Sequence, residues 1–476
     1  MIRRHAIIIG GGASGVLLAY QLLRFGSPAY RVTLVERRPE IGRGLAYHTG
    51  NPEHLLNVRA ANMSALPEDP DHFWRWLSAR AITGCGDPYC FVPRRVYGDY
   101  IASLIRPLVS RGDEADGLRI MNVECVSISE DADGVVIELA NGDQLSGDVA
   151  ILATGHDARK APMACYADPW TPPSSAGIDK DAPVLILGTG LTMVDYVLSL
   201  LREGHEGPII ALSRRGLLPK AHRAVAALRI DEAEVPFGAS ASQLLRWFRH
   251  RASAHLAQGG DWRSVIDGIR PYTQRLWREL PIRSRRRFLE HARAWWDIHR
   301  HRMAPDIEFR ITKAIADGRL GLIAGKTVEI VPNATGARVR YRRRGQTRIE
   351  SLDVDAIVDC TGIVKNPAAT SNPAVRSLFD QGLARVDPLR IGIEVMPDCA
   401  VVDRSGVPSR RLFAIGPLTR AAFWEIMAIP DIRNQCAELA ERLVRNAATA
   451  RIPPSVLRAP VARRAPSEKM RVIGHQ

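Results

Sequence analysis

A glycine-rich turn near the start of the chain has the residues needed to hold the phosphates of a nucleotide. It spans residues 10–15 (GGGASG), and Gly10, Gly12 and Gly15 occupy the three glycine positions of the motif GxGxxG. In this motif the first glycine permits a tight turn, the second lets the backbone approach a pyrophosphate, and the third lets helix and strand pack closely. The free N–H groups at the start of the following helix attract the phosphates. These residues therefore predict a dinucleotide site.

The segments around this turn have the pattern of a strand, a helix and a second strand. Residues 6–9 (AIII) are a buried-strand run, residues 16–23 (VLLAYQLL) form an amphipathic helix, and residues 31–35 (RVTLV) form the next strand. Glu36 ends that strand, 21 residues after Gly15, where a carboxylate can accept hydrogen bonds from ribose hydroxyls. The complete unit favours a Rossmann-like domain over a plain glycine turn followed by an exposed glutamate.

A second unit of the same kind begins near residue 183. An apolar strand at residues 183–187 leads into a turn with Gly188 and Gly190, and a helix follows. Met193 stands where the third glycine would be, so the motif is incomplete. Together with an apolar strand at residues 209–212, it still predicts a second dinucleotide-binding unit.

The residues after this last strand indicate which nucleotide the second unit prefers. Ser213, Arg214 and Arg215 follow the strand, and no acid stands at its end. A hydroxyl and two guanidinium groups suit the 2′-phosphate of NADP, whereas the missing carboxylate argues against NAD. We expect NADPH rather than NADH, the alternative being that both arginines are ordinary surface residues.

Two further apolar strands each run into a Thr-Gly pair. Residues 148–153 precede Thr154 and Gly155, and residues 355–360 precede Thr361 and Gly362. This symmetry matches the crossover strands by which a two-dinucleotide flavoprotein passes from one domain to the other.

A last apolar strand, at residues 412–415, runs into Gly416 and Pro417. A helix with Pro430 in its first turn is expected to follow and to run to about Val444. Its N-terminus could face the N1 and C2 carbonyl of a flavin, where negative charge collects on reduction. The alternative is a plain packing helix.

The composition indicates the number of domains and excludes several classes of protein. The 476 residues suit two or three domains, and the net charge of +14 comes almost entirely from arginine, without a nucleic-acid recognition motif. Seven scattered cysteines fit reduced thiols better than a disulfide framework, and no zinc spacing occurs. No apolar run is long enough for a membrane span, and residues 1–7 show no export signal. We expect a cytoplasmic protein with no metal and no nucleic-acid partner.

The chain resembles the large group of bacterial FAD/NAD(P)-binding proteins that are similar to flavin-containing and N-hydroxylating monooxygenases. Beyond the glycine turns, the resemblance is carried by residues 42–47 (GRGLAY), 54–58 (HLLNV), 94–100 (RRVYGDY), 153–156 (ATGH), 168–170 (DPW), 188–195 (GTGLTMVD) and 424–430 (WEIMAIP). It covers nearly the whole chain. It implies an α/β protein with two Rossmann-like dinucleotide-binding domains, a glutathione-reductase-like FAD domain and an NADPH domain, with a helical insertion.

We expect three segments on this basis. Residues 1–170 would form the first part of the FAD-binding domain, and residues 178–362 the NAD(P)H-binding domain. A helical insertion with five tryptophans, at about residues 217–320, would lie within the second domain, where it would cover an active site, form a subunit interface of a homo-oligomer or simply pack as core. Residues 363–476 would form the second part of the FAD domain and the C-terminal helix.

The resemblance implies that the first unit holds FAD, with Glu36 on the adenosine half, residues 42–47 beside pyrophosphate and flavin, and Val123 under the adenine. The expected cofactor-binding residues are Gly10, Gly12, Ala13, Ser14, Gly15, Glu36, Arg37, Gly44, Leu45, Asn57, Val123, Thr154, Gly155, Gly188, Gly190, Leu191, Thr192, Ser213, Arg214, Arg215, Thr361, Gly362, Gly416, Pro417 and Ile429.

Three polar residues on one loop are candidate catalytic residues. Asn57, Asn62 and Ser64 offer amide and hydroxyl groups that could bond flavin N5 or a C4a-peroxide. The alternative is that they are turn residues whose side chains satisfy their own backbone.

Two departures from the motifs of related flavoproteins narrow the range of expected activities. The Baeyer-Villiger type carries an FxGxxxHxxxW-like linker, whereas here residues 153–157 (ATGHD) are followed by Trp170 only later, which argues against ketone oxidation. Cys85 and Cys90 lie 49 and 54 residues past Glu36, which does not match the redox pair of the disulfide reductases.

We therefore predict an FAD-dependent, NADPH-using monooxygenase. It would use O₂ to oxygenate a small nucleophile through a flavin C4a-peroxide, and the family likeness favours the nitrogen of an amine or hydroxylamine. One alternative is an NAD(P)H:acceptor flavin oxidoreductase that passes electrons to a quinone or to a redox protein docked on the basic insertion. Another is a flavin-bound scaffold or sensor that turns over slowly.

Overall fold

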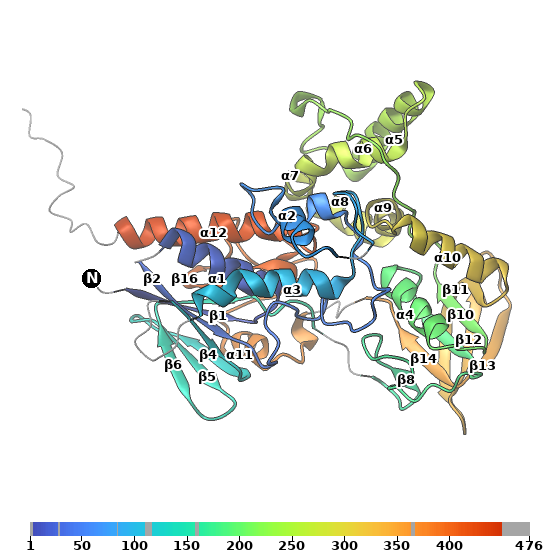
Figure 1. Cartoon of the computed structure of the whole chain (residues 1–476), viewed down its shortest axis with the longest axis horizontal. Coiled ribbons are helices and arrows are strands. Elements are labelled where there is room, and N and C mark those ends of the chain that lie inside the picture. The colour runs from blue at the N-terminus through green and yellow to red at the C-terminus, as the bar shows by residue number, and fades with distance from the viewer. Residues whose placement is uncertain are drawn as a thin grey trace, which may run out of the picture.

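A computed structural model describes residues 3–26, 29–82, 84–109, 117–157, 161–362 and 367–449. Residues 450–476, which were assigned to the end of the second FAD part, lie outside the described residues. The described chain forms two α/β bodies side by side, with a group of helices above their junction (Figure 1).

The first body is built on a six-stranded sheet in the order β15-β16-β7-β1-β2-β3. Its strands are β1 (Arg4–Ile9), β2 (Tyr30–Val35), β3 (Leu118–Met121), β7 (Val149–Leu152), β15 (Ala400–Val402) and β16 (Pro408–Ala414). All pairs are parallel except β15 with β16. The central strands β1 and β7 are buried along nearly their whole length, as expected of parallel strands covered on both faces.

Different elements cover the two faces of this sheet. The helices α1 (Ala13–Gly26), α3 (Arg94–Ile105) and α12 (Ile429–Thr449) lie on one side, and α1 packs on both of the others (Figure 1). The other side holds α11 (Pro373–Gln381) and the antiparallel strands β4 (Cys125–Glu130), β5 (Val135–Leu139) and β6 (Gln144–Gly147). The C-terminal helix therefore packs beside the helix that follows the first glycine turn.

The second body is a seven-stranded sheet in the order β13-β12-β11-β10-β9-β14-β8. Its strands are β8 (Tyr166–Ala167), β9 (Val184–Leu187), β10 (Ile209–Ser213), β11 (Leu320–Pro332), β12 (Ala337–Arg343), β13 (Ile349–Val354) and β14 (Ala356–Asp359). The strands from β8 to β11 pair in parallel, whereas β11, β12 and β13 form an antiparallel meander. The helices α4 (Leu191–Arg202) and α10 (Pro305–Ala316) pack against each other beside this sheet.

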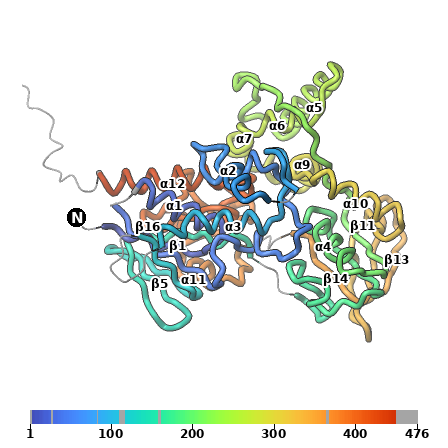
Figure 2. Tube along the Cα trace, viewed as in Figure 1, coloured from blue at the N-terminus to red at the C-terminus, as the bar shows by residue number. Residues whose placement is uncertain are grey.

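The helical insertion lies between β10 and α10 and rises above both bodies (Figure 2). Its helices are η3 (Glu232–Glu234), α5 (Ala241–Ala257), α6 (Trp262–Ile269), η4 (Arg270–Tyr272), α7 (Thr273–Glu279), α8 (Ile282–Arg287), the π-helical turn η5 (Phe288–Ala292) and α9 (Arg293–Arg300). The remaining short helices of the chain are η1 (Ala60–Asn62), α2 (His72–Ser78), η2 (Arg106–Leu108), η6 (Pro367–Ala369) and η7 (Gly416–Thr419).

A buried ion pair fastens this insertion to the first body. Arg300 of α9 donates from Nε to Glu425 at 2.8 Å, and both side chains are less than a tenth exposed. Trp296 donates its indole N–H to the same carboxylate. Trp424, the residue before Glu425, stacks on Trp277 of α7 with ring centroids 4.4 Å apart. The insertion is thus held at the segment that leads into α12.

The predicted α/β class with two dinucleotide-type sheets is confirmed. The boundaries expected at residues 170, 178 and 362 stay predictions, and β8, at Tyr166–Ala167, belongs to the second sheet. The two meanders were not expected from the sequence.

One expectation was wrong. Cys85 and Cys90 were expected to be reduced, but they form a disulfide, because the turn between them brings their Cα atoms to 5.2 Å. The five other cysteines are free.

The Glu425–Arg300 pair yields a stability prediction. Glu425→Gln removes the carboxylate with which the buried Arg300 forms its ion pair, so the free energy of unfolding should fall by about 3 kcal/mol or more. Glu329→Gln is the control, because its ion pair with Arg340 is about half exposed and should contribute about 1 kcal/mol or less. Urea unfolding followed by circular dichroism measures both. Equal losses in the two variants would contradict the prediction.

Candidate nucleotide-binding site

The three glycines of the first turn do different things. Gly10 has a φ of 109°, and a β-carbon there would collide with the Ala153 carbonyl oxygen of the neighbouring strand. A β-carbon on Gly15 would overlap the Gly10 carbonyl oxygen. At Gly12, by contrast, a β-carbon would meet nothing nearer than Gly44 Cα at 3.5 Å. Gly10 and Gly15 are required by the fold itself, and Gly12 leaves space for a ligand.

The second turn repeats this geometry. Gly188 has a φ of 105°, and a β-carbon there would lie 2.6 Å from the Cys360 carbonyl oxygen. Gly190, at the position of Gly12, has open space beside it. The backbone N–H of Gly10 donates to Val35 and that of Gly188 to Leu212, at 2.8 Å in both units. These bonds set the two units in register, with Ser213 at the position of Glu36.

The residue at this position differs in charge between the two units. Glu36 accepts from the backbone N–H of Gly11 at 2.7 Å and of Arg38 at 3.0 Å, one bond on each carboxylate oxygen. Each oxygen keeps a lone pair for a ribose hydroxyl. In the second unit, the Ser213 hydroxyl is shared with Thr189 at 2.9 Å and accepts from the Gly216 N–H at 3.0 Å. The first unit is therefore anionic at the ribose position and the second is neutral.

A cavity of about 270 Å³ runs along the edge of the first sheet from the first glycine turn to the start of α12. Its lining includes thirteen of the expected cofactor-binding residues, namely Gly10, Gly12, Ala13, Ser14, Glu36, Arg37, Gly44, Leu45, Val123, Thr154, Gly155, Pro417 and Ile429. Gly416 lies just behind it, with its N–H held by the Gln435 side chain at 2.8 Å. An elongated dinucleotide such as FAD fits this arrangement, because the turn leaves space at Gly12 and a carboxylate stands at the adenosine end.

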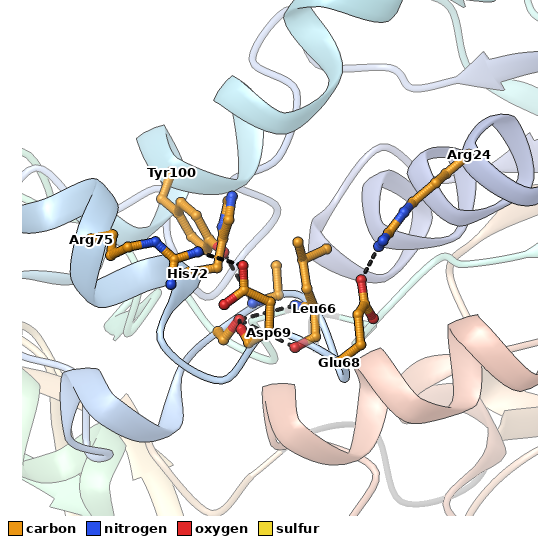
Figure 3. A network of polar contacts seen from close by, with 9 residues as sticks. Arg24, Leu66, Glu68, Asp69, His72, Arg75 and Tyr100 are labelled. Atoms are coloured by element: carbon orange, nitrogen blue, oxygen red, sulfur yellow. Dashed lines mark hydrogen bonds and ion pairs between the residues drawn. The ribbon is translucent and has the colours of Figure 1, made fainter.

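The candidate catalytic residues are not part of this lining. The Ser64 hydroxyl is fully buried and donates to the Asp69 carbonyl oxygen at 2.6 Å. This turn is held by Tyr100, whose hydroxyl accepts from the Ala65 N–H and bonds His72, and by the Asp69–Arg75 ion pair (Figure 3). Burial raises the pKa of Tyr100 to about 12, so its hydroxyl stays protonated. Ser64 thus satisfies its own turn, while Asn62 is exposed at the end of η1.

Asn57 lies where the two bodies meet. It lines a small pocket together with Leu191 and Asp195 at the start of α4. Its carbonyl oxygen bonds Nε2 of His222, from the insertion, at 3.0 Å. The catalytic role of Asn57, Asn62 and Ser64 stays a prediction, and Asn57 is the one that stands between the two nucleotide units.

Polar contacts hold the two bodies together around this pocket. Arg94, at the start of α3, pairs with Asp195 of α4 at 2.8 Å, and both side chains are largely buried. His54 bonds the Ser199 hydroxyl and the Asp195 carbonyl oxygen, both at 2.9 Å. The loop before Asn57 is therefore fixed on the helix that follows the second glycine turn.

The residues expected around the second nucleotide gather at the carboxyl edge of the second sheet. Leu191 and Thr192 open α4 directly after Gly190, and Thr361 and Gly362 follow β14. Arg214 is exposed, whereas Arg215 donates from Nη2 to the His291 carbonyl oxygen of the insertion at 2.9 Å. The binding roles of all these residues stay predictions.

His156 is one of the lining residues that were not proposed from the sequence. His156 directly follows Thr154 and Gly155, and its Nδ1 is buried without a hydrogen-bond partner among the described residues. Burial and the nearby Arg420 guanidinium lower the pKa of His156 to about 4, so its imidazole is neutral. The position after a Thr-Gly pair at a crossover strand was the available signal. His156 offers the cavity one uncharged ring nitrogen.

The described residues show neither of two other kinds of feature. No group of three or more potential metal ligands occurs among them. Within the same part of the chain, no helix combines the length and the apolar character needed to cross a membrane.

Comparison with known proteins connects this geometry to flavoproteins. Residues 7–157 match a family model described as FAD-NAD(P)-binding. A curated relative, a probable 2-heptyl-3-hydroxy-4(1H)-quinolone synthase of Rhodococcus erythropolis, is 29% identical over 170 residues, which are 33% of this chain. The chain spans only 41% of that relative's length.

Solved structures resemble nearly the whole chain. An ornithine N-hydroxylase of Kutzneria sp. 744, determined with reduced FAD, NADP⁺ and L-ornithine, has a TM-score of 0.63 at 14% identity, over 94% of this chain and all of that one. The L-lysine 6-monooxygenase of Pseudomonas syringae has a TM-score of 0.61 at 15% identity, with the same coverage. At such identities the likeness shows a shared fold, that of two-dinucleotide-domain flavoproteins.

The different roles of Gly12 and Gly15 can be separated by mutation. Gly12→Ala should fold normally and lose FAD, because its β-carbon takes up space beside the turn and touches nothing else closely. Gly15→Ala should lose both FAD and thermal stability, because its β-carbon overlaps the backbone. The flavin-to-protein ratio and the melting temperature measure the two effects. A yellow Gly12→Ala protein with a normal ratio would contradict the assignment.

His156 predicts a pH dependence of stability. The folded protein keeps the imidazole neutral down to about pH 4, whereas the unfolded chain takes up a proton below its ordinary value of 6.5. The free energy of unfolding should therefore fall as the pH drops from about 6.5 to about 4. His156→Gln should make this slope shallower in unfolding titrations.

A second histidine provides the comparison. Burial also lowers the pKa of His222 to about 4, so His222→Gln should reduce the slope as well, and the double variant should show the sum. A slope that His156→Gln leaves unchanged would mean that the His156 ring takes up its proton at the same pH in the folded and the unfolded protein.

Proposed function

We propose that this chain is an FAD- and NADPH-dependent monooxygenase that oxygenates the nitrogen of a small molecule. The observation that carries the proposal is the pair of matching glycine turns, which have a carboxylate at the ribose position in the first unit and a neutral hydroxyl followed by an arginine in the second. Glu36 in the first unit suits the free ribose hydroxyls of FAD, and Ser213 with Arg214 in the second suits a 2′-phosphate. One chain thus offers separate sites for two nucleotides.

The first body would bind and orient FAD along the cavity. The N–H groups at the start of α1 and the space beside Gly12 favour the pyrophosphate, and Glu36 accepts from the ribose. The first turn of α12, which contributes Ile429 and Ile432 to the lining, would meet the other end of the nucleotide. When bound, FAD supplies the redox chemistry, since it can accept a hydride from NADPH and deliver electrons to O₂.

The contacts between the bodies would position the second nucleotide against the first. The Arg94–Asp195 pair and the His54 bonds hold the N-terminus of α4 beside the loop that contains Asn57. Since a nucleotide pyrophosphate binds at such a helix start, its reactive end would lie near the small pocket that Asn57 and Leu191 line. The insertion reaches this place through His222 and limits the access of water.

Two further points concern which atom of the substrate is oxygenated. Two proteins that share the fold are named an ornithine N-hydroxylase and an L-lysine 6-monooxygenase, and both of the amino acids in these names carry a side-chain amine. The linker typical of ketone oxidation is absent from residues 153–170. Both points favour an amine or hydroxylamine substrate.

A second candidate function has one observation in its favour. The helix α5 has no buried side chain, and Leu245, Arg246 and Arg249 lie exposed along one face. An acidic redox protein could dock there and receive electrons from the flavin, in which case the chain would be an NAD(P)H:acceptor oxidoreductase.

Substrate-stimulated NADPH oxidation distinguishes the two. Purified flavoprotein is mixed with NADPH, air and a panel of amines, amino acids and hydroxylamines, and products are weighed for the gain of one oxygen atom. We expect at least one amine to accelerate NADPH oxidation and to gain oxygen. No oxygenated product with any nitrogen compound, together with salt-sensitive reduction of an acidic electron carrier, would replace the proposal by the second candidate.

A further inference from the structure

The C-terminal end of β12 lies near Arg214 at the edge of the second sheet. β10 pairs in parallel with β11, with Ser213 opposite Ala324. The chain then runs along β11 and returns along β12, and the N–H of Arg344 donates to the Ala324 carbonyl oxygen at 2.8 Å. Arg344 thus lies one strand away from the turn that begins at Ser213, although 131 residues separate the two in the sequence.

The first unit shows which part of a nucleotide belongs at this place. There β2 pairs Val35 with Met121, and Val123, two residues further on, lines the cavity at its Glu36 end. In the second unit the equivalent pair is Leu212 with Ile323, which puts Gly325 at the position of Val123.

Gly325 pairs with Arg343 across the meander, and Arg344 comes next. In the first unit the antiparallel pairing starts two residues after Val123, where Cys125 of β4 pairs with Leu139 of β5. In the second unit it already includes the position equivalent to Val123. The meander therefore adds an arginine to the second unit at the adenosine end.

The arginines on one face of β12 differ along the strand in whether they have an acidic partner. Arg338 pairs with Asp353, and Arg340 pairs with Glu329, both at 2.8 Å. Further along, Arg342 stands opposite Lys326, and neither Arg342 nor Arg344 has an acidic partner within the described residues. Cations placed directly opposite one another destabilise a sheet. A bound anion next to them would remove that cost.

Arg215 is less available for such an anion. Its Nη2 donates to the His291 carbonyl oxygen at 2.9 Å, which ties the end of β10 to the insertion. Arg214, the residue before it, is exposed and has no acidic partner in the described parts of the chain.

We propose that Arg344 joins Arg214 in binding the 2′-phosphate of the nicotinamide nucleotide, and that Arg215 is a tie to the insertion. The inference rests on the proposed use of NADPH and adds a specificity-determining residue from a distant part of the sequence. A dianionic phosphate between two guanidinium groups forms charge-assisted hydrogen bonds with both. A nucleotide without that phosphate makes neither.

The test compares two ligands that differ only in the 2′-phosphate, adenosine 2′,5′-bisphosphate and adenosine 5′-monophosphate. Calorimetric titration of the FAD-loaded protein should give a clear preference for the bisphosphate. Arg344→Ala should weaken bisphosphate binding about tenfold or more and leave the monophosphate unchanged, since one charge-assisted contact is lost. Arg344→Lys should restore part of the preference. Arg338→Ala, on the same face of β12 but paired with Asp353, is the matched control and should change neither ligand.

The outcomes separate this inference from the function on which it rests. If the native protein prefers the bisphosphate and Arg344→Ala keeps that preference, Arg344 is not a phosphate contact and the inference fails alone. If Arg215→Ala removes the preference while Arg344→Ala does not, Arg214 and Arg215 form the site instead. If the native protein binds both ligands equally, the proposed preference for NADPH fails, and this subsite fails with it. Melting curves of every variant confirm that the fold is intact.

Discussion

The structure depends on a close approach of backbones at two places, each at the carboxyl edge of a parallel sheet. The chain turns sharply after β1 at Gly10 and after β9 at Gly188, directly against the carbonyl oxygens of Ala153 and Cys360 on the adjacent crossover strands. No side chain fits there, so the turn after each first strand and the end of each crossover strand are fixed together. This packing leaves the edge free of side chains, and a nucleotide backbone can take their place.

The same constraint explains how one chain can pass twice between two bodies. Each crossover strand, β7 or β14, must end in small residues at the edge where the glycine turn lies, and from there the chain enters the other body. The insertion begins after β10 of the second body, and its residue Arg300 contacts the first body at Glu425. Glu425 has a φ of 66°, which is unusual for a residue with a side chain, and its carboxylate is held by Arg300 and Trp296. The insertion therefore contacts the segment directly before α12, where Ile429 lines the cavity.

The parts that could be predicted from the sequence are those set by local patterns. Apolar runs ending in glycine turns located β1, β7, β9, β14 and β16. Thirteen of the residues expected from these runs and from the family resemblance line the cavity. The meanders could not be found this way. Where β11 leaves the parallel sheet, its residues are partly buried or exposed, and buried and exposed residues alternate weakly along it.

The same limit applies to side chains whose partners are distant in the sequence. Ser64 has the residue type of a catalytic donor, but its hydroxyl is used by a carbonyl oxygen five residues away. His156, Arg300 and Arg344 acquire their surroundings only from tertiary contacts. The Cys85–Cys90 disulfide depends on the conformation of a short turn, which spacing alone does not reveal.

The large excess of arginine acquires a physical meaning in this arrangement. Many guanidinium groups donate hydrogen bonds to backbone carbonyl oxygens within the molecule. Arg433 donates to Ser64 and joins segments far apart in the sequence, and Arg285 donates to Leu280 at the end of a helix. Such arginines add to the net charge of +14 without forming a surface for a polyanion. The arginines left without acids at the second sheet edge are different, because they gather where the first unit has a carboxylate. On the proposed function, Glu36 would repel a 2′-phosphate and Arg214 would attract it, so this one electrostatic difference would direct FAD to the first unit and NADPH to the second.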